Sequence, residues 1–104
     1  MDKEKIYEIS FQLILHSGNT RSLAMEALYE AKAGNFVEAE AKIREAEQES
    51  VKAHHFQTDL IQGEARGTKY DIPIILIHAQ DHLMTALTVM DLAKEFIDLY
   101  KKIL

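Results

Sequence analysis

The sequence predicts an all-α fold of three long helices, and three observations point to it. The 104-residue chain contains one proline and four glycines, so few signals interrupt a helix. Apolar residues recur at steps of three, four or seven, which is the spacing of one helix face. Hydrophobic residues make up 47% of the chain and charged residues 28%, a globular composition. At this length we expect a single domain, residues 1–104.

The first helix is expected over residues 3–32. Two apolar stripes run along this segment at helical spacing. The first holds Ile6, Ile9, Leu13, Thr20, Ala24, Ala27 and Ala31, and the second holds Tyr7, Phe11, Ile14, Met25 and Leu28. Gly34 follows and can adopt the left-handed backbone conformation that ends many helices.

A second helix is predicted to begin after Asn35, because Asn35 followed by Glu38 fits a capping box. Its apolar stripe holds Phe36, Ala39, Ile43, Ala46, Ala53 and Leu60. The outer face between Glu38 and Glu49 is strongly acidic and is expected to face solvent. Gly63 and Gly67 indicate where this helix ends.

A third helix is expected after Asp71, which can cap it, with Pro73 in the first turn, where a missing amide proton costs nothing. From Ile74 onward this helix is apolar nearly all round. Ile74, Ile77, Met84 and Leu87 lie to one side, and Ile75, Val89, Leu92, Phe96, Leu99 and Ile103 lie to another. A three-helix monomer covers only part of such a helix, so the leftover face predicts a trimer of parallel third helices or a dimer of hairpins.

Charge and composition exclude several classes of function. Twelve Lys and Arg residues against 17 Asp and Glu give a net charge of −5, which argues against nucleic acid and anionic membranes as partners. Cysteine is absent, so a disulfide, a thiolate nucleophile and an iron–sulfur cluster are excluded. We expect no signal peptide in the charged N-terminus and no membrane insertion of residues 72–93, whose apolar run is interrupted by polar residues. These features favour a cytoplasmic protein.

The one concentration of chemically active side chains is His78-Ala79-Gln80-Asp81-His82. On a helix, His78 and His82 lie about 40° apart, and Asp81 lies about 60° to the other side of His78. Three polar groups therefore share one sector of the most apolar helix, where burial is costly unless they are hydrogen-bonded, paired or metal-bound.

This cluster allows three interpretations. The histidines are polar residues satisfied at an oligomer edge, or they are ligands of a metallohydrolase, because H-x-x-D-H is similar to the zinc-peptidase pattern H-x-x-E-H. The zinc-peptidase pattern requires a glutamate, a third ligand further along the chain and a substrate cleft. Here the acid is aspartate, and the sequence indicates neither of the other two features. In the third interpretation one neutral imidazole is the nucleophile of phosphoryl transfer, and the imidazole one turn away hydrogen-bonds the phosphoryl oxygens.

The other histidines are expected to be structural. His16 lies beside Ser17 and Gly18, where small residues leave room for a neighbouring helix, and one of His54 and His55 is expected to face inward. The segment 63–67 is no phosphate-binding loop, because it lacks both a Lys-Ser/Thr pair and a preceding strand.

The octapeptide His78-Ala79-Gln80-Asp81-His82-Leu83-Met84-Thr85 resembles the active-site signature of a known family. This family is the enzyme IIA component of the lactose/cellobiose branch of the bacterial phosphoenolpyruvate-dependent sugar phosphotransferase system. Residues 17–22, parts of 34–65 and the ending 91–101 are similar to the family as well, so the resemblance extends over essentially the whole chain.

The resemblance implies three long antiparallel helices per subunit, assembled as a homotrimeric helical bundle. It implies that His78 accepts a phosphoryl group from the phosphocarrier protein HPr and passes it to a cysteine of the cognate IIB component. It further implies that Asp81 meets its two symmetry copies around one shared divalent cation, usually Mg²⁺, which would relieve the repulsion among three buried carboxylates. His82 and Gln80 occupy the accompanying polar positions, His82 as a partner of the phosphoryl oxygens or of the other imidazole.

Two other functions remain as alternatives. One is a helical adaptor or regulatory module that is phosphorylated without passing the group on, and the other is a metal-binding helical oligomer. In a sugar phosphotransferase system the membrane component selects the sugar, so cellobiose, chitobiose and lactose all remain possible substrates. Ala79 within the motif favours cellobiose or a related β-glucoside.

Overall fold

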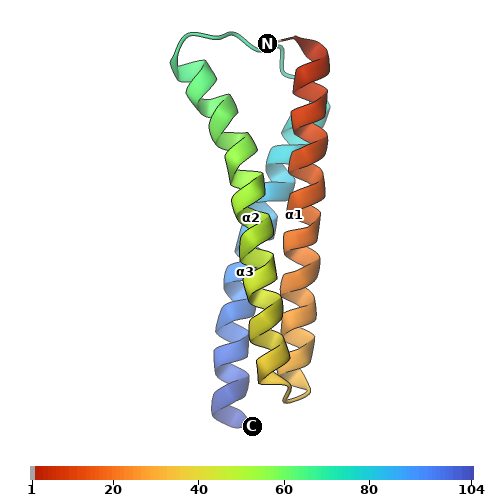
Figure 1. The fold of residues 1–104 in the computed structure, drawn as a ribbon, viewed down its shortest axis with the longest axis vertical. Coiled ribbons are helices and arrows are strands. Elements are labelled where there is room, and N and C mark those ends of the chain that lie inside the picture. The colour runs from red at the N-terminus through yellow and green to blue at the C-terminus, as the bar shows by residue number, and fades with distance from the viewer. Residues whose placement is uncertain (1) are drawn as a thin grey trace.

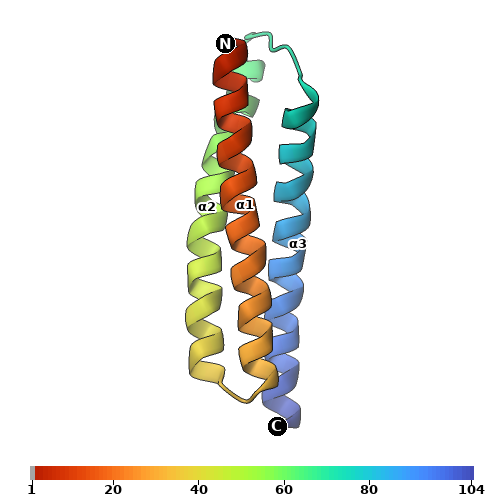
Figure 2. The ribbon, with the colours of Figure 1, turned by 90° about the vertical axis from the view of Figure 1, so that its right-hand side faces the viewer.

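The computed structural model describes residues 2–104, which form three helices of equal length (Figures 1 and 2). The first helix, α1, spans Lys3–Lys32, α2 spans Phe36–Ala65 and α3 spans Ile74–Ile103. α1 and α3 run in the same direction and α2 runs opposite to both, which gives a rod of 52 × 20 × 17 Å. The predicted all-α fold of three long helices is confirmed. Met1, the first residue of the predicted domain, lies outside the described residues.

The first helix begins and ends as its sequence predicts. Asp2 caps it, because the Asp2 carboxylate accepts a hydrogen bond from the amide of Lys5 at 2.9 Å. Gly34 follows the helix with φ +85°, a left-handed conformation that glycine adopts without steric cost.

Two other predicted caps are wrong. Asn35 precedes α2, but its side-chain amide donates to the carboxylate of Glu30 at 3.0 Å, so the capping box with Glu38 does not form. Asp71 lies two residues too early, because α3 begins only after Pro73. The extended backbone of Pro73 leads directly into the helix, and no side chain caps it.

The predicted stripes of α1 and α2 form most of the core, in two clusters. The cluster near the N-terminus of α1 contains Ile6, Ile9, Leu13, Ala53, Leu60, Leu76, Ala79 and Leu83. The cluster near the other end contains Ala24, Ala27, Ala31, Ala39, Ile43, Ala46, Met90, Ala93 and Ile97. The core thus uses a third face of α3, running from Leu76 to Ile97, which the sequence pattern did not separate from the other apolar faces.

A polar layer lies between the two clusters. Ser17, Thr20 and Ser50 are buried there, and Thr20 donates to the carbonyl of His16 at 2.8 Å. His16 is structural, as predicted: its Nδ1 lies 2.6 Å from the Oε2 of Glu49 on α2. His54 and His55 are both exposed, so the prediction that one faces inward is wrong.

The acidic face of α2 is only partly solvated, in contrast to the prediction. Glu40 binds Lys101 at 2.6 Å and Glu47 binds Lys94 at 2.9 Å, so two of its carboxylates bridge to α3. These ion pairs are half-exposed and contribute little stability each.

The apolar face left over on α3 is exposed, as predicted. Its large apolar side chains are Ile74, Ile77, Met84, Leu92, Phe96, Leu99 and Ile103, each between 45% and 83% exposed. No helix within residues 2–104 carries an apolar run long enough to cross a membrane.

The contact between His16 and Glu49 predicts a dependence of stability on pH. Burial raises the pKa of Glu49, but hydrogen bonds from His16 and Asn19 and the charge of Lys52 outweigh it, so the net pKa lies below the usual value. A carboxylate with a lowered pKa stabilises the fold above its unfolded value, about 4.3, and this contribution is lost as the pH falls through the lowered value.

We therefore expect Glu49→Gln to destabilise the fold by about 1 kcal/mol near neutral pH, the usual size of one hydrogen-bond contribution. The difference from wild type should shrink as the pH falls below the unfolded value and through the lowered pKa of Glu49, because the wild-type carboxylate then becomes protonated. Thermal unfolding from pH 3 to 7 measures both effects. A difference that stays constant with pH would contradict this assignment.

Candidate functional site

The two histidines of the predicted cluster are in contact. The Nε2 of His78 lies 3.0 Å from the Nε2 of His82, and the rings meet edge to face with centroids 4.3 Å apart. A hydrogen bond between two ring nitrogens needs one proton, so one ring donates through Nε2–H and the other accepts. The arrangement therefore holds one Nε2 as an unprotonated nitrogen.

α3 fixes this pair in place. Ala79 and Leu83 in the same turns of the helix are buried in the core, which anchors the backbone that carries both histidines. His78 is exposed and His82 is partly buried. The site thus presents an accessible imidazole on a rigid backbone, supported by a second imidazole one turn away.

Asp81 lies on the exposed apolar face of α3. Ile77 and Met84 flank it one turn before and one turn after, and both are exposed. Within residues 2–104 of a single chain, no three His, Asp, Glu or Cys side chains gather in an arrangement that could hold a metal ion.

The structure does not bring Gln80 to the histidines of its own chain. Two residues along a helix correspond to about 200° of rotation, so Gln80 points away from His78. Its Oε1 instead accepts a hydrogen bond from Nε2 of Gln57 on α2 at 2.8 Å. The sequence analysis did not predict this role for Gln57, since it depends on a contact between residues 23 positions apart.

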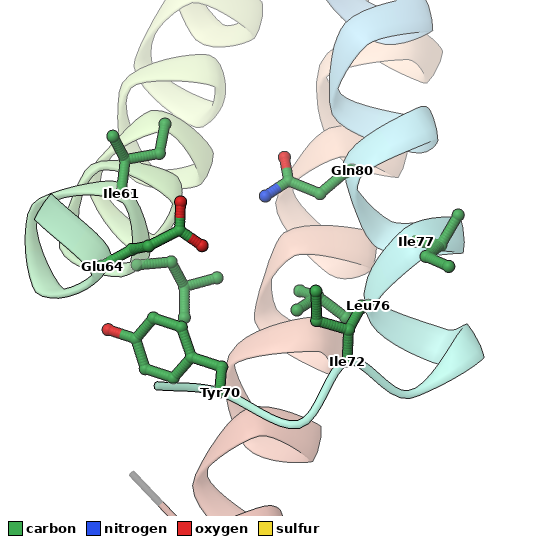
Figure 3. Close-up of a pocket in the computed structure, with 8 residues that line it drawn as sticks. Ile61, Glu64, Tyr70, Ile72, Leu76, Ile77 and Gln80 are labelled. Atoms are coloured by element: carbon green, nitrogen blue, oxygen red, sulfur yellow. The ribbon is translucent and has the colours of Figure 1, made fainter. Parts of the chain in front are cut away.

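Gln80 lies at the edge of an apolar cavity of about 300 Å³ between α2 and α3 (Figure 3). The C-terminal end of α2 leans away from α1 in Figure 1, and residues 66–73 span the resulting gap. Apolar side chains of Leu60, Ile61, Ile72, Leu76 and Ile77 line the cavity, together with Glu64, Tyr70 and Gln80.

Tyr70 closes the side of this cavity next to α2. Its hydroxyl lies against Gly63, where the Cβ of any other residue would be only 1.8 Å from the hydroxyl oxygen. This close approach explains why glycine occurs inside a helix at a buried position. A glycine within a helical pattern was the one sequence signal for this contact.

Comparison with known proteins shows the family. The sequence profile described as "PTS system, Lactose/Cellobiose specific IIA subunit" matches residues 8–101. The chain belongs to this family. It is therefore a IIA component of a sugar phosphotransferase system, a protein that transfers phosphoryl groups, and the identification made from the octapeptide is confirmed.

Individual relatives agree over almost the whole chain. It is 54% identical to the lichenan-specific phosphotransferase enzyme IIA component of Bacillus subtilis (strain 168), over 96% of this chain and 91% of that protein. The crystal structure of the PTS cellobiose-specific enzyme IIA from Bacillus anthracis has a TM-score of 0.93 at 58% identity, covering 99% of this IIA chain and 93% of that chain.

A third relative was solved together with a partner. The solution structure of the IIA(chitobiose)–HPr complex of the Escherichia coli N,N'-diacetylchitobiose branch has a TM-score of 0.82 at 38% identity. The match covers 99% of this IIA chain and 98% of that chain.

The contact between the histidines predicts their tautomers. When both rings are neutral, one should carry its proton on Nε2 and the other on Nδ1, because a single proton lies between the two Nε2 atoms. Imidazole ¹⁵N shifts of labelled protein near pH 8 measure this directly. His82→Phe, which keeps a ring but removes the partner nitrogen, should change the tautomer balance of His78. Unchanged His78 shifts in that variant would show that the contact does not set the tautomer.

Proposed function

We propose that this IIA protein accepts a phosphoryl group from phospho-HPr on Nε2 of His78 and passes it to a cysteine of a cognate IIB component. The contact between His78 and His82 carries this proposal, because it keeps an accessible ring nitrogen next to a second imidazole. The solved complex of a relative with HPr supports the identity of the donor.

The paired rings have the chemistry that the transfer needs. In the reactive arrangement His82 donates its Nε2–H to the lone pair of His78, whose proton is on Nδ1. When the donor approaches, the Nε2 lone pair of His78 forms the new P–N bond as the P–N bond of the donor breaks. The bonding electrons return to the imidazole of HPr. For this attack the N–H of His82 first leaves the lone pair of His78 and turns to a phosphoryl oxygen as the donor approaches.

Apolar surface next to His78 serves docking and protection. Ile74 is 83% exposed one turn before His78, and Ile75 is partly covered. These side chains shield the P–N bond from water, and the part of this apolar surface that remains outside the trimer interface proposed below is available to HPr and the IIB component. Because one patch serves two partners in turn, both complexes are weak and transient.

We further propose that three chains assemble through the exposed face of α3. Asp81 and Leu99 lie near the centre line of this face, with Ile74 and Leu92 close to it, so parallel α3 helices can meet along this line. Each 100 Å² of apolar surface covered in this way contributes about 2.5 kcal/mol of hydrophobic transfer free energy, from which the entropic cost of association is subtracted. His78 lies about 60° from the centre line, at the edge of the interface rather than inside it.

The residues present fit one divalent cation shared by the trimer. Three Asp81 carboxylates brought together at the axis would repel one another, and Mg²⁺ prefers carboxylate and water oxygens. Asp81 is the one acidic side chain near the centre of this face at the level of the histidines, and Ile77 and Met84 surround it with apolar surface. The cation, when bound, neutralises this charge and supports assembly. His78 carries out the transfer itself.

A threefold assembly also gives Gln80 its supporting role. On each α3 helix His82 lies about 100° to one side of the centre line and Gln80 about 100° to the other. In a parallel trimer, the His78 side of one helix therefore faces the Gln80 side of the next. Gln80 thus supports the histidine of the neighbouring subunit.

The relatives narrow the substrate class. Two of the relatives, at 54% and 58% identity, are described as specific for lichenan and for cellobiose, both β-glucosides, and this supports a β-glucoside over the chitobiose of the relative solved with HPr. We propose that this protein serves the uptake of cellobiose or a related β-glucoside, working in the cytoplasm beside its membrane component.

His78→Ala should abolish phosphoryl uptake while leaving the fold intact, because His78 is exposed and supports no core contact. Intact-mass spectrometry after incubation with phosphoenolpyruvate, enzyme I and HPr measures uptake as an acid-labile adduct. Adding a IIB protein should discharge the wild-type adduct, which separates a carrier from a regulatory module. An adduct that survives His78→Ala would move the site elsewhere.

Asp81→Ala should remove the metal and retain the trimer, because the apolar face of α3 still drives assembly and three repelling charges are gone. Light scattering gives the oligomeric state, and Mg²⁺ titration of the melting temperature gives metal binding. Wild type should melt at a higher temperature with Mg²⁺ than with a chelator, and the variant should show no difference. Dissociation of the variant into monomers would make the cation the main element of assembly.

A further inference from the structure

Gln57 and Gln80 form the one hydrogen bond between uncharged side chains that joins α2 and α3 within residues 2–104. The other side-chain links between these helices are the ion pairs of Lys94 and Lys101. Both glutamines are partly buried, and Gln80 borders the apolar cavity. Two apolar side chains would join the helices there without the cost of desolvating two amides, so packing alone does not explain this pair.

The hydrogen bond fixes which end of the Gln80 amide is free. Gln57 donates from Nε2 to Oε1 of Gln80 at 2.8 Å, so both N–H groups of Gln80 remain available. Figure 3 shows the amide nitrogen of Gln80 on the side toward Glu64, across the cavity. A carboxylate only accepts hydrogen bonds, so Glu64 favours the same orientation.

The free N–H groups lie at the mouth of an open cavity. Ile61, Ile72 and Ile77 line it and are each about 60% exposed, so the cavity opens on the surface next to the exposed face of α3. In the proposed trimer this side of α3 faces His78 of the neighbouring subunit. The two walls of the groove between subunits are then His82 of one chain and Gln80 of the next.

We propose that Gln57 is a positioning residue for phosphoryl transfer at His78. It holds the amide of Gln80 so that N–H groups, and not the carbonyl oxygen, face the phosphoryl group on the neighbouring subunit. N–H donors stabilise the charge on the phosphoryl oxygens, whereas a carbonyl oxygen would repel it. This inference rests on the proposed function and on the trimer.

Gln57→Glu tests the orientation directly. A glutamate at this position has the same length and can still hydrogen-bond Gln80, but it only accepts. Gln80 must then turn its amide over to donate, which places its carbonyl oxygen toward the groove. We expect a folded trimer whose maximal rate of uptake from phospho-HPr is about tenfold lower near neutral pH, with little change in the HPr concentration that gives half this rate.

Two further variants separate orientation from stability. Gln57→Leu removes the hydrogen bond and frees Gln80 to rotate, so the rate should fall by about two- to fivefold, less than in Gln57→Glu. Lys94→Gln is the matched control, because it removes another link between α2 and α3 at a distance from the histidines. It should change the melting temperature without changing the rate. An equal loss of rate in Lys94→Gln would assign the effect to helix association and overturn the proposal.

The Gln80→Leu background excludes a direct effect of the added charge. If Gln57 acts through Gln80, Gln57→Glu should cost nothing further when Gln80 is already leucine. The same tenfold loss in that background would overturn the proposal, and so would wild-type rates in Gln57→Glu. His78→Ala, measured alongside, keeps the two hypotheses apart. Uptake by His78→Ala refutes the proposed function, whereas an inactive His78→Ala beside fully active Gln57 variants refutes this inference alone.

Discussion

The structure depends on one constraint: α3 is apolar on two opposite faces, and its own chain covers only one of them. Alanines on α1, α2 and α3 let the helices pack closely around the buried face, which runs from Leu76 to Ile97. The opposite face, from Ile74 to Ile103, stays exposed in the single chain. A soluble protein rarely exposes such a surface without a partner. The face that we propose drives assembly therefore lies on the same helix as the histidines.

The rotation of about 100° per residue along α3 points neighbouring polar side chains in different directions. His78 and His82 lie at one edge of the exposed face, Asp81 lies near its centre line, and Gln80 points toward α2 and its partner Gln57. One rigid turn thereby carries the proposed nucleophile, the proposed subunit contact and a link to the second helix. Because Ala79 and Leu83 anchor this turn in the core, the backbone that carries these polar groups is held in place.

Much of this could be predicted from local sequence. The extents of the helices follow from helical spacing and from the scarcity of glycine. The left-handed turn after α1 follows from the presence of Gly34. One wrong prediction reflects competition between hydrogen-bond partners, because the Asn35 side chain binds Glu30 instead of capping α2. The core face of α3 could not be separated because every face is apolar. The contact between Gln57 and Gln80 joins distant segments, so no local pattern reports it.

The two donors proposed to contact the phosphoryl group, His82 and Gln80, are an imidazole and an amide, which suits a carrier better than lysine or arginine would. No lysine or arginine occurs between Lys69 and Lys94, a span that includes the whole site on α3. A lysine or arginine side chain bound directly to the phosphoryl oxygens would stabilise the phosphohistidine and slow onward transfer, since only interactions stronger in the transition state speed a reaction. Imidazole and amide N–H groups form weaker hydrogen bonds than charged donors. They can orient the phosphoryl oxygens in both half-reactions while still letting the group leave.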